Sequence, residues 1–215
     1  VLLTRGDRRR LPSSTPAHVD VALRDEARYW EARYARGGNS GEGSRGDEVA
    51  WKAARIVREI RACGATSVAD FGTGDGWLTQ LILEGLAGTG VEYTGYDTAP
   101  TAVDLARKRV PGGHFEIGSV LDAPIRCADV VLCVDVLFHM SNQERHAAAV
   151  ASLCAAFKRK AMVITWDARI LSLVEAKKRT GWNHYYPVSF PQTVEVQSER
   201  VPPALAKTLY VLTRK

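Results

Sequence analysis

The sequence predicts an α/β protein with a doubly wound, mostly parallel sheet that is closed at one edge by a C-terminal antiparallel pair. Three observations lead to this fold class. Short apolar runs alternate with segments of helical length between residues 47 and 166. A glycine-rich segment follows the first of these runs, and the last two extended segments have no long helix between them.

The predicted strands are Ser67–Phe71, Glu92–Tyr96, His114–Ile117, Asp129–Val134 and Ala161–Trp166, and the antiparallel pair is Thr193–Ser198 with Thr208–Thr213. The predicted helices are Val21–Tyr34, a segment from Asp47 to Gly64, Gly76–Leu86, Ala99–Arg109 and Asn142–Phe157. Asp47 is expected to cap its helix, and Ser141 with Glu144 forms a capping box for the last one. Strands that alternate with helices are parallel and covered on both faces, which is a Rossmann-like pattern.

Two segments of different character divide the chain. Residues 1–46 read as a flexible basic leader that carries an aromatic helix and ends in a glycine-rich lid, and residues 47–215 as the α/β domain. The lid, Gly37–Gly46, contains five glycines in ten residues, which excludes a regular helix or strand. Such a loop could order over a ligand.

The composition favours one ordinary domain in a reducing compartment. The chain has 215 residues, 46% of them hydrophobic, and a net charge of +5. We interpret the basic residues of the leader, Arg5, Arg8, Arg9 and Arg10, as a solvated tail, with a nucleic-acid arm as the alternative. The four cysteines form no C-x-x-C pair, and neither a secretory signal nor a membrane-spanning run is expected. The predicted location is the cytoplasm, without a membrane partner.

The segment Asp70–Gly76, DFGTGDG, is the predicted ligand loop. It follows the first strand, where open α/β sheets bind their ligands, and its glycines allow close approach of the backbone. Its spacing is G-x-G-x-G, whereas a dinucleotide site prefers G-x-G-x-x-G. Asp70 would repel a pyrophosphate but suits the ammonium group of an amino acid, so the charge favours a cationic ligand.

This loop resembles the first motif of the class I S-adenosylmethionine-dependent methyltransferases, D-x-G-x-G-x-G, through Asp70, Gly72, Gly74 and Gly76. The resemblance implies S-adenosylmethionine as cofactor. In that family an acid after the second strand binds the ribose hydroxyls, here Asp97, and an acid after the third strand meets the adenine amino group, here Asp122. The cofactor-binding residues implied are Asp70, Gly72, Thr73, Gly74, Gly76, Asp97, Thr98, Ser119, Val120, Leu121, Asp122 and, in the fourth-strand motif, Asp135.

His139 is the candidate general base. It lies four residues after Asp135, at the carboxyl end of the fourth strand, and histidine titrates near neutrality. A methyl transfer to a hydroxyl needs a group that removes the proton. The alternative is a histidine that packs over the methionine chain of the cofactor. Asp135, Asp167 and His139 could also gather a divalent metal, which is an alternative and not our prediction.

The candidate acceptor site comes from the leader. Its pattern Y-W-x-x-R-Y-x-x-G-G-N-S-G-x-G-S, from Tyr29 to Ser44, resembles a segment of bacterial methyltransferases that include sugar O-methyltransferases, which implies a saccharide acceptor such as a mannoside. The candidate acceptor residues are Trp30, Tyr34, Asn39, Ser40 and Ser44, together with His184 and Tyr185 from an aromatic cluster at residues 182–187. The alternative for both groups is structural packing. His184 is also an alternative base.

The sequence thus predicts an S-adenosylmethionine-dependent O-methyltransferase that acts on a small, hydroxyl-rich acceptor. The predicted acceptor is a carbohydrate, and the predicted process is polysaccharide biosynthesis. An RNA or protein methyltransferase is the first alternative, and a noncatalytic cofactor-binding module is the second. A nucleic-acid partner is not expected, because no separate RNA-binding module is visible. The N-P-P-Y type segment of amino-group methyltransferases is missing after the fourth strand. The sequence leaves the oligomeric state open.

Overall fold

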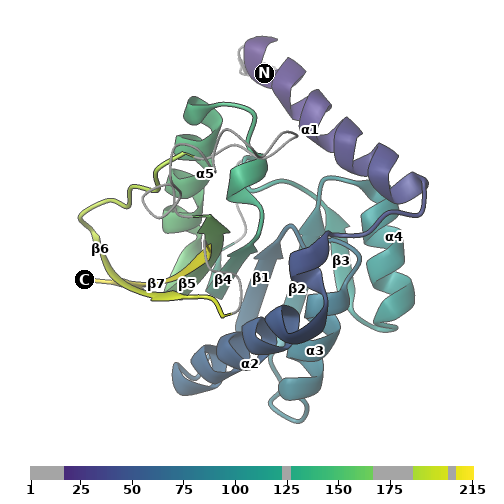
Figure 1. Ribbon diagram of the computed structural model, residues 1–215. Coiled ribbons are helices and arrows are strands. Elements are labelled where there is room, and N and C mark those ends of the chain that lie inside the picture. The colour runs from purple at the N-terminus through teal and green to yellow at the C-terminus, as the bar shows by residue number, and fades with distance from the viewer. Residues whose placement is uncertain (1–16, 123–126, 167–185, 203–206) are drawn as a thin grey trace, which may run out of the picture.

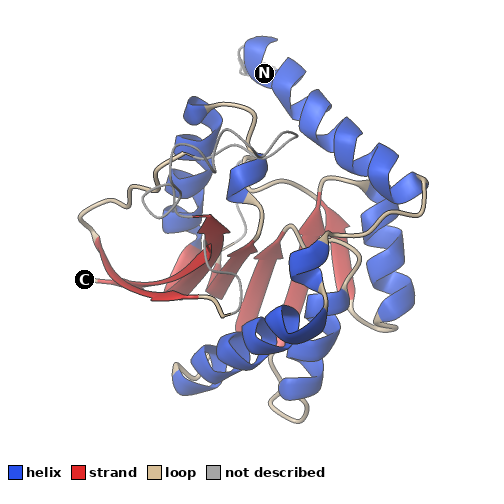
Figure 2. Ribbon diagram, in the orientation of Figure 1, coloured by secondary structure: helices blue, strands red, loops and turns tan. Residues whose placement is uncertain are grey.

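The computed structural model describes residues 17–122, 127–166, 186–202 and 207–215. Its architecture is a twisted sheet between two layers of helices (Figures 1 and 2). The predicted residues Asp167, His184 and Tyr185 lie outside the described residues. Within the described residues, no helix combines the length and the apolar character needed to span a membrane.

The strands agree closely with those that the sequence predicts. They are β1 (Ser67–Phe71), β2 (Glu92–Asp97), β3 (His114–Ile117), β4 (Ala128–Val134), β5 (Phe157–Trp166), β6 (Val194–Arg200) and β7 (Lys207–Arg214). The helices are α1 (Ala17–Ala35), α2 (Gly46–Ala62), α3 (Trp77–Gly85), α4 (Pro100–Arg109) and α5 (Gln143–Ala156), with short 3-10 helices η1 (Glu42–Ser44) and η2 (Leu137–His139).

The sheet has the order β3-β2-β1-β4-β5-β7-β6. Strands β1 to β5 pair in parallel, whereas β7 pairs antiparallel with both β5 and β6. The predicted mostly parallel sheet with a C-terminal antiparallel pair is therefore confirmed. The strand order reverses between β1 and β4, and in an open α/β sheet a ligand crevice forms outside the carboxyl ends of the strands at this point.

Strand β4 shows how both faces of the sheet are covered. Val130 and Leu132 belong to the core beneath α2 and α3, whereas Val131 and Cys133 belong to the core beneath α5. All four are buried, because successive side chains of a strand point to opposite faces. The central strand is thereby fixed from both sides, and its carboxyl end becomes a rigid support for the residues that follow.

Helix α1 lies across the carboxyl ends of the strands (Figure 1). Glu31 accepts hydrogen bonds from the backbone N–H (2.9 Å) and the hydroxyl of Thr101 at the start of α4. Glu26 accepts from Ser141 N–H and, at 2.9 Å, from the Arg145 guanidinium at the start of α5. Two carboxylates of one helix thus bind the positive N-terminal ends of two others, which holds α1 over the crevice. The division of the chain at residue 46 stays a prediction.

Two predicted caps are wrong. Helix α5 is capped by Asn142, whose side chain accepts from Arg145 N–H, and not by Ser141. The reason is that Glu26 binds the backbone of Ser141, and asparagine caps a helix as well as serine does. Helix α2 begins at Gly46 with Arg45 as its N-cap residue, so Asp47 lies in the first turn, where its charge favours the helix dipole.

Candidate active site

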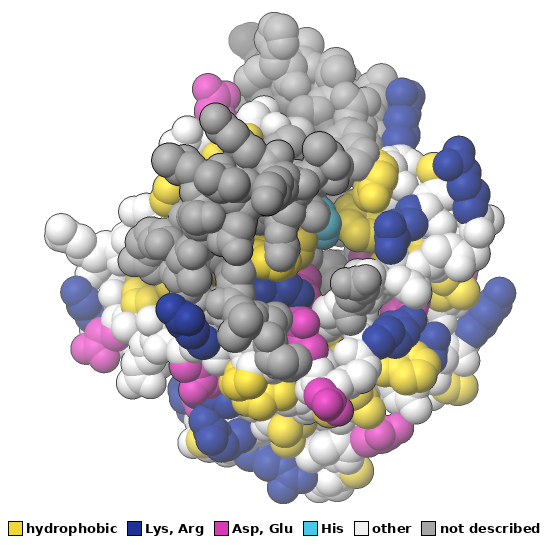
Figure 3. Space-filling model, in the orientation of Figure 1, with side chains coloured by type: hydrophobic (Ala, Val, Ile, Leu, Met, Phe, Trp, Pro, Cys, Tyr) yellow, Lys and Arg dark blue, Asp and Glu magenta, His cyan; other side chains and the backbone are white. Residues whose placement is uncertain are grey.

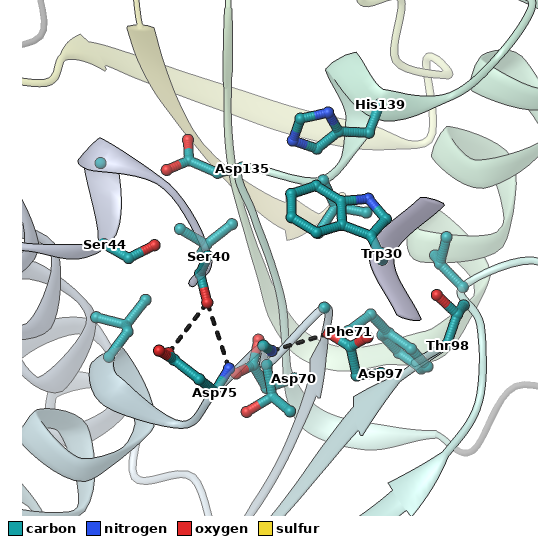
Figure 4. Close-up of a pocket in the computed structure, with 18 of the residues that line it drawn as sticks. Trp30, Ser40, Ser44, Asp70, Phe71, Asp75, Asp97, Thr98, Asp135 and His139 are labelled. Atoms are coloured by element: carbon teal, nitrogen blue, oxygen red, sulfur yellow. Dashed lines mark hydrogen bonds between the residues drawn. The ribbon is translucent and has the colours of Figure 1, made fainter. Parts of the chain in front are cut away.

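The main pocket lies at the carboxyl ends of β1 and β4, under α1 and the lid (Figure 4). Figure 3 shows a hollow on this face, with hydrophobic, acidic and basic side chains and a histidine around it. The predicted residues that line it are Trp30, Tyr34, Ser40, Ser44, Asp70, Gly72, Thr73, Gly74, Asp97, Thr98, Ser119, Val120, Asp135 and His139. Four predicted residues do not line it: Asn39, Gly76, Leu121 and Asp122.

The glycine-rich loop turns sharply between β1 and α3. Gly72 and Thr73 donate their backbone N–H groups to Tyr96 O at 2.7 and 3.0 Å, and Gly74 N–H donates to Asp97 Oδ2 at 2.9 Å. Gly74 has a φ of 59°, a left-handed conformation that other residues rarely adopt. A Cβ at this position would overlap Ser40 Oγ and lie 2.9 Å from Tyr34 OH. The loop and the lid therefore approach each other more closely than a side chain would allow.

Asp70 and Asp97 form a buried acidic floor in the pocket. Burial raises the pKa of each carboxyl to about 6. Tyr93 OH donates to Asp70 at 2.7 Å, and the N–H groups of Gly74 and Ala99 donate to the two oxygens of Asp97. Within the described residues, neither carboxylate has an ion pair. A cationic ligand would supply the missing positive charge, since buried charges are otherwise costly.

The loop after β3 contributes less than predicted. Ser119 and Val120 line the pocket, but Leu121 packs against the core beneath α5. Asp122 accepts from Ser119 N–H at 2.6 Å and so closes its own loop. Its proposed contact with adenine stays a prediction, and in this conformation the carboxylate stabilises the loop.

The lid is bound to the glycine-rich loop through Asp75, which is not one of the predicted site residues. Ser40 Oγ donates to Asp75 Oδ1 at 3.0 Å, and Arg45 forms an ion pair with Asp75 Oδ2 at 2.5 Å. Tyr34 OH lies 2.9 Å from Ser40 Oγ, and it must donate because the single proton of Ser40 is already used. Burial raises the pKa of Tyr34, so the phenol keeps this proton.

A second contact binds the lid to α2. The buried Lys52 donates to Gly43 O at 2.8 Å and forms ion pairs with Glu48 and Asp135, each at 2.5 Å. Lys207 on β7 reaches the same two carboxylates at 2.7 and 2.9 Å. These four side chains, which we call the lysine–carboxylate cluster, join α2, β4 and β7. A sequence signal existed, because Lys52 stands on the same helical face as Val49, Ala53 and Ile56.

The aromatic residues of α1 have two different environments. Tyr34 is 4% exposed and packs against Ala99 and Ala102 of the α4 region, which leaves little of its ring for an acceptor. Trp30 lies edge-on to His139, with ring centroids 4.8 Å apart. Figure 4 shows His139 and Trp30 next to each other over the pocket. The side chain of Asn39 bonds Gly41 N–H and thus shapes the lid.

Metal ligation has little support among the described residues. They contain no group of three histidine, cysteine or acidic side chains arranged to hold an ion. Of the three predicted ligands, Asp135 and His139 are described, and Oδ2 of Asp135 already contacts two ammonium groups. Two buried positive charges would repel a divalent cation at this oxygen.

The pocket has an acidic floor and a glycine-rich wall, and it lies at the switch point of a doubly wound sheet, where proteins of this fold class bind their ligands. A sequence profile of the methyltransferase domain family matches residues 68–181, more than half of the chain. The chain therefore belongs to this family, and with the class I fold it is an S-adenosylmethionine-dependent methyltransferase. No individual curated protein matches the sequence.

Solved structures of several methyltransferases share the fold. The magnesium protoporphyrin IX methyltransferase of Synechocystis PCC 6803, solved with bound SAH, is 17% identical with a TM-score of 0.65 over 92% of this chain and 100% of its own. An O-methyltransferase family protein of Burkholderia thailandensis is 17% identical with a TM-score of 0.59 over 79% of this chain. This chain spans 58% of the length of that protein. Small RNA methyltransferase HEN1 is 17% identical with a TM-score of 0.56, over 76% of this chain and 25% of its own.

Proposed function

We propose that this enzyme methylates a hydroxyl group of a small saccharide, most closely a mannoside as in methylmannose polysaccharide synthesis, in the cytoplasm. The observation that carries the proposal is the placement of His139. The imidazole lies beside Trp30 at the pocket, at the carboxyl end of β4, where an acceptor can meet both a base and a flat aromatic face. The leader motif supports a sugar, since it resembles that of sugar O-methyltransferases.

The cofactor is proposed to lie along the acidic floor. Asp70 would face the ammonium group of its methionine portion. The oxygens of Asp97 accept backbone N–H groups, among them those of Gly74 and Ala99, and this side chain lines the pocket, where its remaining lone pairs would accept from the ribose hydroxyls. Ser119 and Val120 would flank the adenine. When bound, S-adenosylmethionine supplies an electrophilic methyl group, and the protein's part is to align the acceptor and to take its proton.

Replacing His139 tests this function. We expect His139→Gln and His139→Phe each to lower kcat by about 10² to 10⁴, because neither side chain can take the proton of the acceptor hydroxyl. Phenylalanine keeps the packing against Trp30, so it separates a base from a packing residue. The measurement is transfer of a labelled methyl group to a panel of manno-oligosaccharides, phenols and RNA, with the product mapped by mass spectrometry.

The matched control for this experiment is His114→Ala, which replaces an exposed histidine on β3. The kcat of this variant should stay at the wild-type level. Calorimetry should show unchanged affinity for S-adenosylhomocysteine in all variants. A His139→Phe enzyme with near wild-type turnover would eliminate the base. Methylation of RNA alone would eliminate the saccharide.

The pH dependence of cofactor affinity follows from the two buried carboxyls. Their pKa values are raised from 3.8 to about 6, so each is protonated at about pH 5 and ionised at about pH 7.5. A cationic ligand favours the ionised form. We therefore expect the Kd for S-adenosylmethionine to rise at least about tenfold from pH 7.5 to pH 5, with proton release on binding near pH 6.

The same shifts predict the stability of the ligand-free protein. Because burial disfavours the ionised carboxyls, the free energy of unfolding should decrease as pH rises from about 4 through about 6 and then level off.

The proton release on binding of S-adenosylmethionine is measured by calorimetry in two buffers of different ionisation enthalpy. A Kd that is flat across this range would contradict the role of the acidic floor.

A further inference from the structure

Asp135 has an unusual backbone at the end of β4. Its φ is 59°, and it is the one residue other than glycine with a left-handed conformation among the described residues. Such a conformation costs about 1 to 3 kcal/mol and persists where surrounding contacts enforce it. Here the contacts come from the lysine–carboxylate cluster, and the side chain lines the pocket.

The two oxygens of Asp135 have opposite environments. Oδ2 accepts from Lys52 at 2.5 Å and from Lys207 at 2.9 Å, and the side chains of these lysines are 1% and 7% exposed. Burial works against the charged form of Lys207, but Asp135 and Glu48 outweigh it and raise the pKa of this lysine. The carboxylate is therefore held at one oxygen by two buried lysine side chains.

Oδ1 is buried and has no hydrogen-bond partner among the described residues. A buried acceptor without a donor costs about 1 to 3 kcal/mol, and more when it is charged. In Figure 4, Asp135 and His139 lie on one side of the pocket, and Asp70, Asp75 and Asp97 lie on the other. A donor for Oδ1 would thus come from the molecule that occupies the side of His139.

We propose that Asp135 Oδ1 accepts a hydrogen bond from a hydroxyl group of the saccharide acceptor. Asp135 is then a residue that positions the acceptor, and not a cofactor contact or a metal ligand. The two lysines hold Oδ2, so that Oδ1 is the oxygen left for a donor that the acceptor brings. This inference rests on the proposed function and names one residue that recognises its substrate.

Asp135→Asn tests the inference sharply. Lys52 and Lys207 are donors, so they should hold the amide oxygen at the position of Oδ2 and turn the amide NH₂ toward the pocket. A donor then replaces an acceptor at the same place. We expect affinity of the S-adenosylhomocysteine complex for mannotetraose, measured by calorimetry, to fall at least about tenfold, while affinity for S-adenosylhomocysteine changes less than about twofold.

The matched control is Asp104→Asn, the same substitution on α4 at a carboxylate that is 65% exposed and does not line the pocket. Its mannotetraose affinity should stay within about threefold of the wild type. An equal loss in both variants, or a loss of cofactor affinity in Asp135→Asn alone, would overturn the inference. So would a loss of wild-type mannotetraose binding on addition of a chelator, because that outcome indicates a metal.

The failure of the proposed function gives a different result. If the wild-type complex does not bind mannotetraose, the saccharide acceptor is wrong and the inference falls with it. If the wild type binds and Asp135→Asn binds equally well, only the inference is wrong. Should Asp135→Asn not fold, monodeoxy mannosides with the wild type replace it: one missing hydroxyl should cost about tenfold, and equal affinity for all of them would refute the contact.

Discussion

Lys52→Met is expected to lower the free energy of unfolding by about 3 to 5 kcal/mol, because removing one partner of a buried ion pair leaves uncompensated charge. The Lys52 side chain is 1% exposed and is within 2.5 Å of both Glu48 and Asp135. It also donates to Gly43 O, so the lid loses a contact as well. Lys207 alone would then compensate for the negative charges of Glu48 and Asp135, whose side chains are only 15% and 16% exposed.

Urea denaturation followed by circular dichroism measures this loss. The matched control is Lys108→Met, the same substitution at an exposed position of α4, where a change within about 0.5 kcal/mol is expected. A loss below about 1 kcal/mol for Lys52→Met would mean that water or a shift of Lys207 compensates for the missing ammonium group, and the cluster would lose its structural importance.

Gly74→Ala is expected to open the lid. The added methyl group would overlap Ser40 Oγ and come within 2.9 Å of Tyr34 OH, so the hydrogen bonds from Tyr34 to Ser40 and from Ser40 to Asp75 could not both form. The loss of two hydrogen bonds should reduce the free energy that favours the closed lid by about 1 to 3 kcal/mol. Hydrogen exchange in residues 38–45 should then be about 5-fold to 150-fold faster.

The control for this variant is Gly64→Ala. Its φ of 60° matches the 59° of Gly74, but a Cβ at Gly64 meets no atom within 4 Å. Both variants pay the same backbone cost of about 1 to 2 kcal/mol, and only Gly74→Ala meets the lid. Equal exchange rates in the lid of the two variants would show that Ser40 and Tyr34 do not hold it closed.

The prediction of the strands depended on a local signal. The residues of β1 and β3 were predicted with their observed bounds, because each run is short and is followed by a glycine, Gly72 or Gly118, that interrupts the pattern. The order of the strands in the sheet was not predicted, because no pairing of strands is visible in the residues, and it came from the structure. Strand β5 was predicted too short, since Phe157 leads directly from α5 into the strand without a turn signal.

The prediction of the site was partial for a different reason. Asp70 and Asp97 lie at the carboxyl ends of β1 and β2 and line one pocket, as the sequence suggested. Asp122 has a similar position after β3 but bonds its own loop, a choice that the position along the chain does not reveal. Asp75 was overlooked because its partners Ser40 and Arg45 are 35 and 30 residues away.

The sequence by itself determined the class of the protein: the alternation of strands and helices, the glycine-rich loop and the acids after successive strands specify a cofactor-binding methyltransferase domain. Only the tertiary structure decided how the lid is held and which atom of Asp135 is left for a ligand. The physical reason is that strand and turn signals are local, whereas buried charges are compensated by whichever residue the fold brings near. Lys52 and Lys207 lie on opposite sides of Asp135 in the chain and meet it only after α2, β4 and β7 have packed.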